Sequence, residues 1–244
     1  MTRLLPPAAS AHAAQIDFVL TLVHILMLVL FAGWGAYFVF VLFRFRRGRQ
    51  PKANFKGARG RIALFVEIAV VLAEAALLVL LALPLWFKQT SASPAKENLL
   101  VVRVVAEQFA WNVHYPGADG VFGETSLALV SPTNPLGLNR DARAGRDDIV
   151  EQSLIHLPLD RAVLIELSSK DVIHSFGVPA MRVKQDAVPG LMTPVWFVPT
   201  RLGDFEIACS QLCGLGHYRM RGIITVESAA AFAKFLADEA KAQR

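Results

Sequence analysis

The stretch Cys209-Ser-Gln-Leu-Cys213-Gly-Leu-Gly-His217-Tyr-Arg-Met220 decides how this chain folds and what it binds. It places both cysteines of the 244-residue protein in the same twelve residues as a histidine and a methionine. Thiolate, imidazole and thioether ligands suit soft, redox-active metals such as copper better than magnesium or calcium. One cysteine in such a set would suggest a mononuclear copper site, whereas two cysteines four residues apart can bridge two copper ions. The stretch therefore predicts a copper centre.

Two other interpretations of the same residues remain open at this point. Cys209 and Cys213 could form a small-loop disulfide, which an oxidising compartment permits. The spacings of four, four and three residues could also form one stripe of a buried helix. Gly214 and Gly216 favour a loop instead, because glycine is costly inside a helix and common in turns.

A second histidine ligand is expected upstream of this stretch. The run Asp171-Val-Ile-His-Ser-Phe-Gly-Val-Pro179 has the composition of a strand and contains His174. A single histidine in such a run is more often a packed core residue than a ligand. The downstream motif needs another imidazole, however, so we predict that His174 is a metal ligand.

Two long apolar stretches near the N-terminus predict membrane-spanning helices. Phe18 to Phe43 and Ile62 to Phe87 are each 26 residues long. About 20 apolar residues are enough to cross a bilayer as a helix. We therefore expect spans at about residues 16–43 and 62–87, joined by a loop over residues 44–61.

The loop between the predicted spans is basic, which predicts its side of the membrane. It contains eight Lys and Arg residues and no acidic residue. Such loops stay on the cytoplasmic side, so both termini and the cysteine motif should lie outside.

Residues 96–244 contain fifteen basic and seventeen acidic residues, a net charge of −2, although the whole chain carries +5. The positive charge thus belongs to the loop, and nucleic-acid binding is not expected.

The remainder of the chain has the pattern of an all-β domain, because many short β-rich runs are separated by Pro and Gly turns. The predicted strands are residues 99–105, 109–115, 153–157, 162–167, 172–178, 192–198, 204–208 and 222–226. Residues 131–149 predict a long surface loop. Ser228 predicts the N-cap of a final helix that extends to Phe235.

The residues from Asp171 to Met220 resemble subunit 2 of cytochrome c oxidase. The resemblance includes Asp186-Ala-Val-Pro-Gly190, Trp196-Phe-Val-Pro-Thr200 and the Cys-x3-Cys-x3-His-x2-Met signature. It implies a two-helix transmembrane hairpin over residues 1–95 and an all-β cupredoxin domain, a Greek-key sandwich or barrel, over residues 96–227. A C-terminal helix and tail would occupy residues 228–244.

The resemblance also implies a function and a ligand set. Cys209 and Cys213 would bridge two copper ions of a copper A centre, with His174 and His217 each binding one. Met220 and the backbone carbonyl of Gln211 would be weak ligands. The centre would accept electrons from reduced cytochrome c and pass them to the heme of subunit 1, for reduction of oxygen to water coupled to proton pumping. The implied partners are subunit 1, other oxidase subunits, membrane lipid and a basic cytochrome c, which the mildly acidic outer domain would attract.

The implied location is the bacterial plasma membrane, with the copper domain on the periplasmic side. Glu67, one turn inside the second span, matches the family's glutamate at the entrance of a proton channel. A glutamate this close to a helix end could also simply reach the lipid headgroups. We also expect three apolar side chains to keep water from the metal: Phe176, Leu212 and Leu215.

Two features depart from the common family pattern. The residue between the cysteines is usually a glutamate that helps to bind magnesium at the interface with subunit 1, and here it is Gln211. A neutral amide is a poorer ligand for a hard cation, so the magnesium site is in doubt. The aromatic run that receives electrons reads Phe109-Ala-Trp111 here, which leaves two candidate rings.

Three alternatives from other classes were compared with this interpretation. A quinol oxidase subunit has lost its copper, but the ligand set here is complete. Nitrous oxide reductase shares the signature but carries a large second domain, for which this chain has no room. The non-redox alternative is a membrane-anchored cupredoxin-like assembly or copper-delivery factor.

Overall fold

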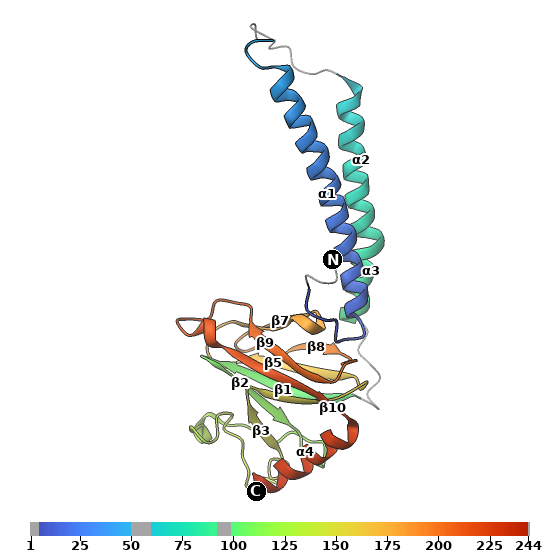
Figure 1. Cartoon of the computed structure of the whole chain (residues 1–244). Coiled ribbons are helices and arrows are strands. Elements are labelled where there is room, and N and C mark those ends of the chain that lie inside the picture. The colour runs from blue at the N-terminus through green and yellow to red at the C-terminus, as the bar shows by residue number, and fades with distance from the viewer. Residues whose placement is uncertain (1–4, 50–59, 92–98, 244) are drawn as a thin grey trace. The chain divides into compact units, whose positions relative to one another are not determined.

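The computed structural model describes residues 5–49, 60–91 and 99–243, which form two compact units (Figure 1). One unit is a pair of helices over Gln15–Ser91, and the other is a β domain that also includes the N-terminal segment before residue 15. The predicted boundary at residues 95 and 96 lies outside the described residues.

The helical unit confirms two helices of membrane-spanning length. The first helix, α1, is Ala13–Arg44, and the second continuous helix runs from Arg61 to Thr90, with mean hydropathies of 2.4 and 2.6 in their most apolar windows. At about 1.5 Å per residue, helices of 32 and 30 residues both exceed the roughly 30 Å hydrocarbon core of a bilayer. Both are therefore long and apolar enough to cross a membrane.

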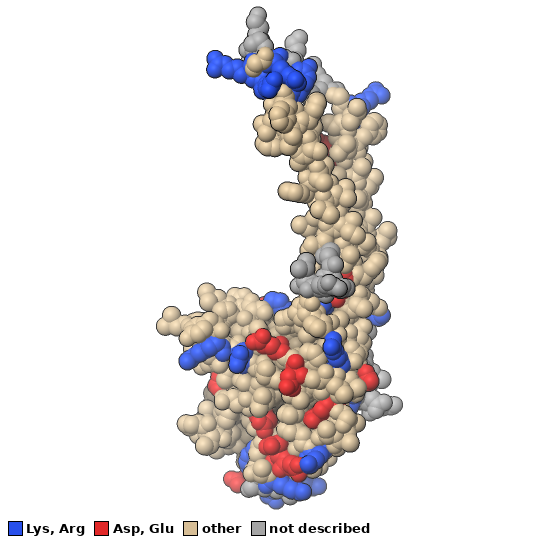
Figure 2. All heavy atoms as spheres, viewed as in Figure 1, with Lys and Arg blue, Asp and Glu red and all other residues tan. Residues whose placement is uncertain are grey.

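A π-helical turn interrupts the second helix. The helix α2 (Arg61–Leu77) passes into a π segment, Leu78–Ala82, and then into α3 (Leu83–Ser91). Pro84 follows directly, and a proline has no N–H to donate to the carbonyl four residues earlier. The wider turn accommodates this missing bond. At the loop end of the helical unit, Figure 2 shows a cluster of blue Lys and Arg atoms. Arg46, Arg47 and Arg49 follow α1 and are exposed, and residues 50–59 lie outside the described part.

The β domain consists of two five-stranded sheets with orders β3-β2-β1-β5-β8 and β4-β10-β9-β6-β7. The strands of the first sheet are β1 (Leu100–Glu107), β2 (Ala110–Tyr115), β3 (Ile149–Gln152), β5 (Val163–Ser169) and β8 (Thr193–Phe197). Those of the second are β4 (Leu154–Pro158), β6 (His174–Val178), β7 (Val183–Ala187), β9 (Gly203–Cys209) and β10 (Arg221–Glu227). Helix α4 (Ala229–Ala242) follows the last strand.

The hydrophobic core lies between the two sheets. Alternate residues of β1 and β5 are buried, among them Val102, Val104 and Ile165, while Ile207 and Ile224 come from the second sheet. Alternation of this kind is expected of strands with one face on a core and one toward solvent. The predicted all-β sandwich is confirmed.

Two strands were not predicted, and both are edge strands. β7 reads Val-Lys-Gln-Asp-Ala and has no apolar alternation, because only its ends are buried. β3 is four residues long and lies at the end of the predicted long loop, separated from β4 by Ser153 at φ 60°.

The final helix extends to Ala242 rather than ending at Phe235, and Ser228 caps it by accepting a hydrogen bond from the Ala231 N–H at 3.2 Å.

The segment before α1 contacts the β domain. The Ala9 N–H donates to the Ala180 carbonyl at 2.8 Å, and the Thr200 N–H donates to the Ala9 carbonyl at 2.9 Å. The Ser10 hydroxyl donates to the Met181 carbonyl at 2.7 Å and is buried. The sequence grouped residues 1–14 with the membrane hairpin, but residues 9 and 10 pair with the β domain because its loops offer them backbone partners.

A buried, hydrogen-bonded histidine–aspartate pair holds the long segment between β2 and β3 in place. The Asp148 carboxylate lies 2.6 Å from His114 Nε2 and accepts hydrogen bonds from the N–H groups of Gly117 and Gly123. Both side chains of the pair are almost fully buried. Burial alone would raise the pKa of Asp148, but the hydrogen bonds from His114, Gly123 and Gly117 lower it below its ordinary value. The predicted surface loop is therefore anchored at its end.

Replacing Asp148 by Ala should lower the free energy of unfolding by about 3–5 kcal/mol, because His114 and two N–H groups lose their acceptor in the interior. Urea denaturation followed by circular dichroism measures this. The matched control is Asp147→Ala, whose side chain accepts one exposed hydrogen bond from Ala118 and should cost less than about 1.5 kcal/mol.

The pH dependence of the same variant follows from the lowered pKa of Asp148. A carboxyl group whose pKa is lower in the folded state than in the unfolded state stabilises the fold at pH values above its unfolded-state pKa, about 3.9. This contribution is lost as the pH falls through the folded-state pKa. The difference between the native chain and Asp148→Ala should therefore be constant at neutral pH and shrink below about pH 4. Equal losses for both aspartate variants, or a difference independent of pH, would contradict this role.

Candidate metal centre

Pairing between two strands brings His174 close to Cys209, although they are far apart in sequence. β6 and β9 run antiparallel, with Phe176 opposite Cys209 and Gly177 opposite Ala208. His174 begins β6 and Cys209 ends β9, so both reach the same end of the second sheet.

The residues after Cys209 form a loop that returns to the same place. We call residues 209–220 the ligand loop. Gly214 has φ 137°, which side-chain-bearing residues rarely adopt, and a short 3₁₀ turn over His217–Arg219 follows. The loop closes where the Cys209 N–H donates to the Met220 carbonyl at 3.2 Å. This geometry rules out the helical stripe, and both cysteines are free thiols.

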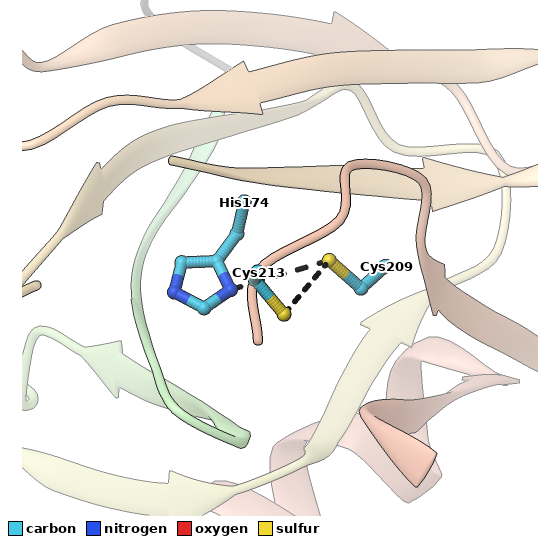
Figure 3. Close-up of side chains that lie close together, drawn as sticks. All are labelled: His174, Cys209 and Cys213. Carbon is cyan, nitrogen blue, oxygen red and sulfur yellow. Dashed lines mark hydrogen bonds between the residues drawn. The ribbon is translucent and has the colours of Figure 1, made fainter. Parts of the chain in front are cut away.

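The side chains of the predicted ligands converge at this loop, and Figure 3 shows three of them, His174, Cys209 and Cys213. Cys209 Sγ lies 3.8 Å from Cys213 Sγ and 4.0 Å from His174 Nδ1. His217 Nδ1 is 3.6 Å from Cys213 Sγ, and Met220 Sδ is 3.1 Å from His174 Nδ1.

The backbone carbonyl oxygen of Gln211 lies 3.1 Å from Cys209 Sγ. The structure thus brings all six predicted ligand residues together: His174, Cys209, Gln211, Cys213, His217 and Met220.

Most of the cluster is shielded from water, with His217 half-buried, and this affects the thiols. His174 is fully buried, and Cys209, Cys213 and Met220 are buried. Burial, followed by the neighbouring Cys209 thiol, raises the pKa of Cys213 to about 11. Two adjacent thiolates are therefore unfavourable here unless a cation compensates their charge, and a bound metal ion is such a cation.

Asp171 orients the first histidine. Its carboxylate oxygen Oδ1 lies 2.9 Å from His174 Nε2, while Oδ2 accepts the Gln108 N–H at 2.7 Å. Burial opposes ionisation, yet hydrogen bonds from His174, Gln108 and Val172 lower the pKa of Asp171. A carboxylate on Nε2 keeps the proton there and leaves the Nδ1 lone pair directed toward the sulfur atoms.

Sequence reasoning assigned no role to Asp171 or Gln108. Gln108 Nε2 donates to the Cys213 carbonyl at 2.6 Å, and so ties the ligand loop to the end of β1. A sequence signal existed for Asp171, since an acidic residue three positions before a ligand histidine can reach its outer nitrogen. None existed for Gln108, because its contact spans 105 residues.

The two candidate electron-accepting rings occupy different depths. Trp111 has no exposed surface and packs edge-on against Phe176 at 5.5 Å and His174 at 6.2 Å. Phe109 is half-buried and lies on the ligand loop, where a Cβ atom on Gly216 would come within 2.4 Å of its ring. Of the two, only Phe109 can contact another protein.

The expected shield of apolar residues is only partly correct. Phe176 is fully buried beside the cluster. Leu212 and Leu215 are instead 77% and 98% exposed, because both side chains point outward from the ligand loop. Those two predictions were wrong; water is excluded by Phe176, Trp111 and the ligands themselves.

The arrangement fits a soft metal ion. Ligand atoms of His174, Cys209 and Cys213 lie within 4.8 Å of one another, and sulfur and imidazole donors of this kind suit copper. A sandwich with such donors at one end of its sheets defines a metal-binding β domain of the cupredoxin class.

Comparisons with known proteins agree with this class. The family "Cytochrome C oxidase subunit II, periplasmic domain" matches residues 100–228. The alternative cytochrome c oxidase subunit 2 of Bradyrhizobium diazoefficiens is 35% identical over 193 residues, which cover 79% of this chain and 68% of that protein. Cytochrome c oxidase subunit 2 of Cereibacter sphaeroides is 31% identical over 94% of this chain and 78% of its own length.

Among solved structures, one match is the periplasmic domain of subunit II of cytochrome oxidase (CoxB) of Bradyrhizobium japonicum. Its TM-score is 0.47 and its sequence identity is 26%, and the match covers 63% of this chain and all of that one. The family match spans more than half of the 244 residues. The chain belongs to the cytochrome c oxidase subunit II family, and it is therefore part of an oxidoreductase complex with other oxidase subunits.

Replacing Asp171 by Ala should weaken copper binding by about 10- to 100-fold, because His174 loses the hydrogen bond that fixes its tautomer. Competition with a copper chelator measures the affinity. The matched control is Asp204→Ala, whose carboxylate accepts a hydrogen bond from Thr225 on an exposed part of the second sheet. Unchanged affinity in Asp171→Ala would show that the carboxylate does not orient the ligand.

Proposed function

We propose that this subunit accepts electrons from a reduced c-type cytochrome at a binuclear copper A centre and passes them to the heme of subunit 1. Oxygen is reduced to water there, with proton pumping. The observation that carries the proposal is the convergence of two thiols, two imidazoles and a thioether at one buried end of the sandwich. Membership of the subunit II family supports the same function.

In this proposal the copper ligands have separate roles. Cys209 and Cys213 would hold both copper ions, and His174 and His217 would each hold one. Met220 and the Gln211 carbonyl are weak ligands that tune the potential. Bound copper would supply a one-electron redox couple at the centre.

The protein contributes a rigid and largely buried set of ligands. Asp171 fixes the His174 ring, and Gln108 fixes the Cys213 carbonyl. The hydrogen bond between Cys209 and Met220 closes the ligand loop at its base. A set of ligands held in this way needs little rearrangement when the charge of the site changes, and this favours rapid electron transfer.

Phe109 is the proposed contact through which electrons arrive. It is the only one of the two candidate rings with exposed surface, and it lies directly on the ligand loop. Trp111 instead supports the centre from inside, through its edge-on contacts with His174 and Phe176.

The proposed topology places the basic loop, residues 44–61, in the cytoplasm, and both termini and the β domain on the periplasmic side of a bacterial plasma membrane. The eight basic residues of the loop support this orientation. Glu67, in the second turn of α2, is the proposed entrance residue of a proton channel shared with subunit 1. Gln211 offers a magnesium ion only a neutral amide, so we do not assign magnesium to this interface.

The purified oxidase should contain two copper ions bound by this chain, with one unpaired electron shared equally by both nuclei. The reason is that two thiols 3.8 Å apart can each contact both ions. Metal analysis and electron paramagnetic resonance test this. One copper per chain, or copper readily lost to a weak chelator, would instead favour a copper-delivery factor.

The ligands should differ in importance. Met220→Leu should keep both copper ions and shift the reduction potential, because a weak axial ligand tunes the centre without holding it. Cys209→Ser should abolish the binuclear spectrum, because one bridging sulfur is lost. Potentiometric titration and copper analysis distinguish the two variants, and equal copper loss in both would contradict this ranking.

A further inference from the structure

A cluster of polar side chains joins the final helix to the first sheet at the end of the β domain opposite the metal centre. β9 and β10 are antiparallel, so the ligand loop connects them at one end and α4 follows β10 at the other. Figure 1 shows α4 beside β3 near the C-terminus. We call four residues at this contact the α4 cluster: Glu151 on β3, Glu239 near the end of α4, Gln243 directly after it, and Arg140 on the long segment between β2 and β3.

The side chain of Gln243 binds every other member of the α4 cluster. Its Oε1 accepts hydrogen bonds from the Val150 N–H and from Arg140 Nη2, both at 3.0 Å. Its Nε2 donates to Glu151 Oε1 at 3.2 Å and to Glu239 Oε2 at 3.1 Å. An amide group has two hydrogens to donate and two lone pairs to accept with, so this side chain is fully used. Two carboxyl groups from different elements thus meet at one nitrogen atom.

The two carboxyl groups have no cation to balance them. Within residues 5–49, 60–91 and 99–243, neither Glu151 nor Glu239 forms an ion pair with Lys or Arg. Arg140 is engaged with Gln243 and, through Nη1, with the Asp148 carbonyl at 3.0 Å. Two ionised carboxylates at this place would repel each other and would have no hydrogen to share. A single proton removes the repulsion and lets the pair form a hydrogen bond.

The other titratable groups packed at this contact have partners of their own. On β4, His156 Nδ1 lies 3.1 Å from Glu227 of β10, and its ring stacks on Phe235 of α4. On β2, the Tyr115 hydroxyl forms hydrogen bonds with the backbone of His156. The remaining charged residues of α4 are exposed, and residue 244 lies outside the described part: Lys234, Asp238 and Lys241.

Two cavities border the α4 cluster. One, of about 330 Å³, lies between Glu151, Arg140, Gln243 and residues 132–135, and gives water access to the carboxyl pair. The other, of about 590 Å³, borders Arg140 and Gln243 but not Glu151. Charged residues of the long segment line this second cavity: Asp119, Asp141, Arg143, Arg146 and Asp147.

The surroundings of Glu151 favour its protonated form. Burial, the negative charge of Glu239 and a hydrogen bond with that residue raise the pKa of Glu151 to about 7. The hydrogen bond from Gln243 acts in the opposite direction and offsets only part of this increase.

We propose that Glu151 and Glu239 share one proton at the contact between β3 and α4, and that this proton makes the attachment of the end of α4 to the sheet dependent on pH. The proposal does not depend on copper or on electron transfer. A carboxyl group whose pKa is higher with the helix attached than with it released favours attachment at low pH, and fully so below the released-state value of about 4.3. The attachment weakens as the pH rises and reaches its lower limit once the pH exceeds the raised pKa of about 7.

Hydrogen–deuterium exchange of the purified oxidase tests this through the protection of residues 236–243, after correction for the intrinsic effect of pH on exchange. Protection should be about tenfold greater at about pH 5.5 than at about pH 7.5, because each unit of pKa difference changes an equilibrium constant tenfold. Residues 100–107 of β1 are the internal reference and should show no such change. Equal protection of residues 236–243 at both pH values, or an equal loss in β1, would overturn the proposal.

Variants locate the proton. Glu151→Gln is neutral at every pH, and its amide can still accept from Gln243 and can donate to Glu239 as the protonated carboxyl group does. It should therefore remove most of the pH dependence and keep α4 protected at about pH 7.5, and Glu239→Gln should do the same. The matched control is Asp238→Asn, which removes an exposed carboxyl group from the same turn of α4 and should retain the native pH dependence.

The copper spectrum reports on the opposite end of the domain and should be the same in all three variants, which shows that each has folded. Native pH dependence in both Glu151→Gln and Glu239→Gln would overturn the proposal. Loss of the pH dependence in Asp238→Asn would overturn it as well, because the effect would then come from the net charge of the helix and not from a shared proton.

Discussion

The antiparallel pairing of β6 with β9 is the contact on which the site depends. It joins two segments separated by 35 residues and places a histidine and a cysteine at the same end of one sheet. Every other ligand comes from the loop that leaves β9 and returns to β10. A shift of this pairing by one residue would turn Cys209 to the opposite face of the sheet. The packed core between the sheets therefore fixes the register, and through it the geometry of the cluster.

Much of the fold could be predicted because its main strands follow simple patterns. β1 and β5 alternate buried and partly exposed residues along their whole length. β2 does not, since five of its six residues are buried: its outer face is covered by the long segment that carries Asp148 and Phe122. The alternation pattern of β2 does not reveal that another segment covers its outer face. The sequence therefore could not show that Trp111 is internal while Phe109 is partly exposed.

The ligand set was predictable because cysteine, histidine and methionine seldom occur together in twelve residues without a metal. The residues that surround the ligands could not be predicted. Gln108 reaches Cys213 across 105 residues, and no local pattern encodes such a contact. The outward direction of Leu212 and Leu215 depends on the turn at Gly214, whose φ of 137° changes which side of the loop faces the interior. Overall charge gives no location either, because a sum over 149 residues does not say where on the domain the charges lie.

The absence of a side chain at Gly216 has a kinetic consequence. The Phe109 ring rests on the loop backbone where even a single methyl group would come within 2.4 Å of it. Electron tunnelling weakens steeply with each ångström of separation and more steeply through gaps than through packed atoms. A larger residue would lift the ring and lengthen the path between the protein surface and the sulfur ligands. With Phe109 as the proposed point of electron entry, glycine at this position would set a tunnelling distance and so constrain the rate of electron transfer.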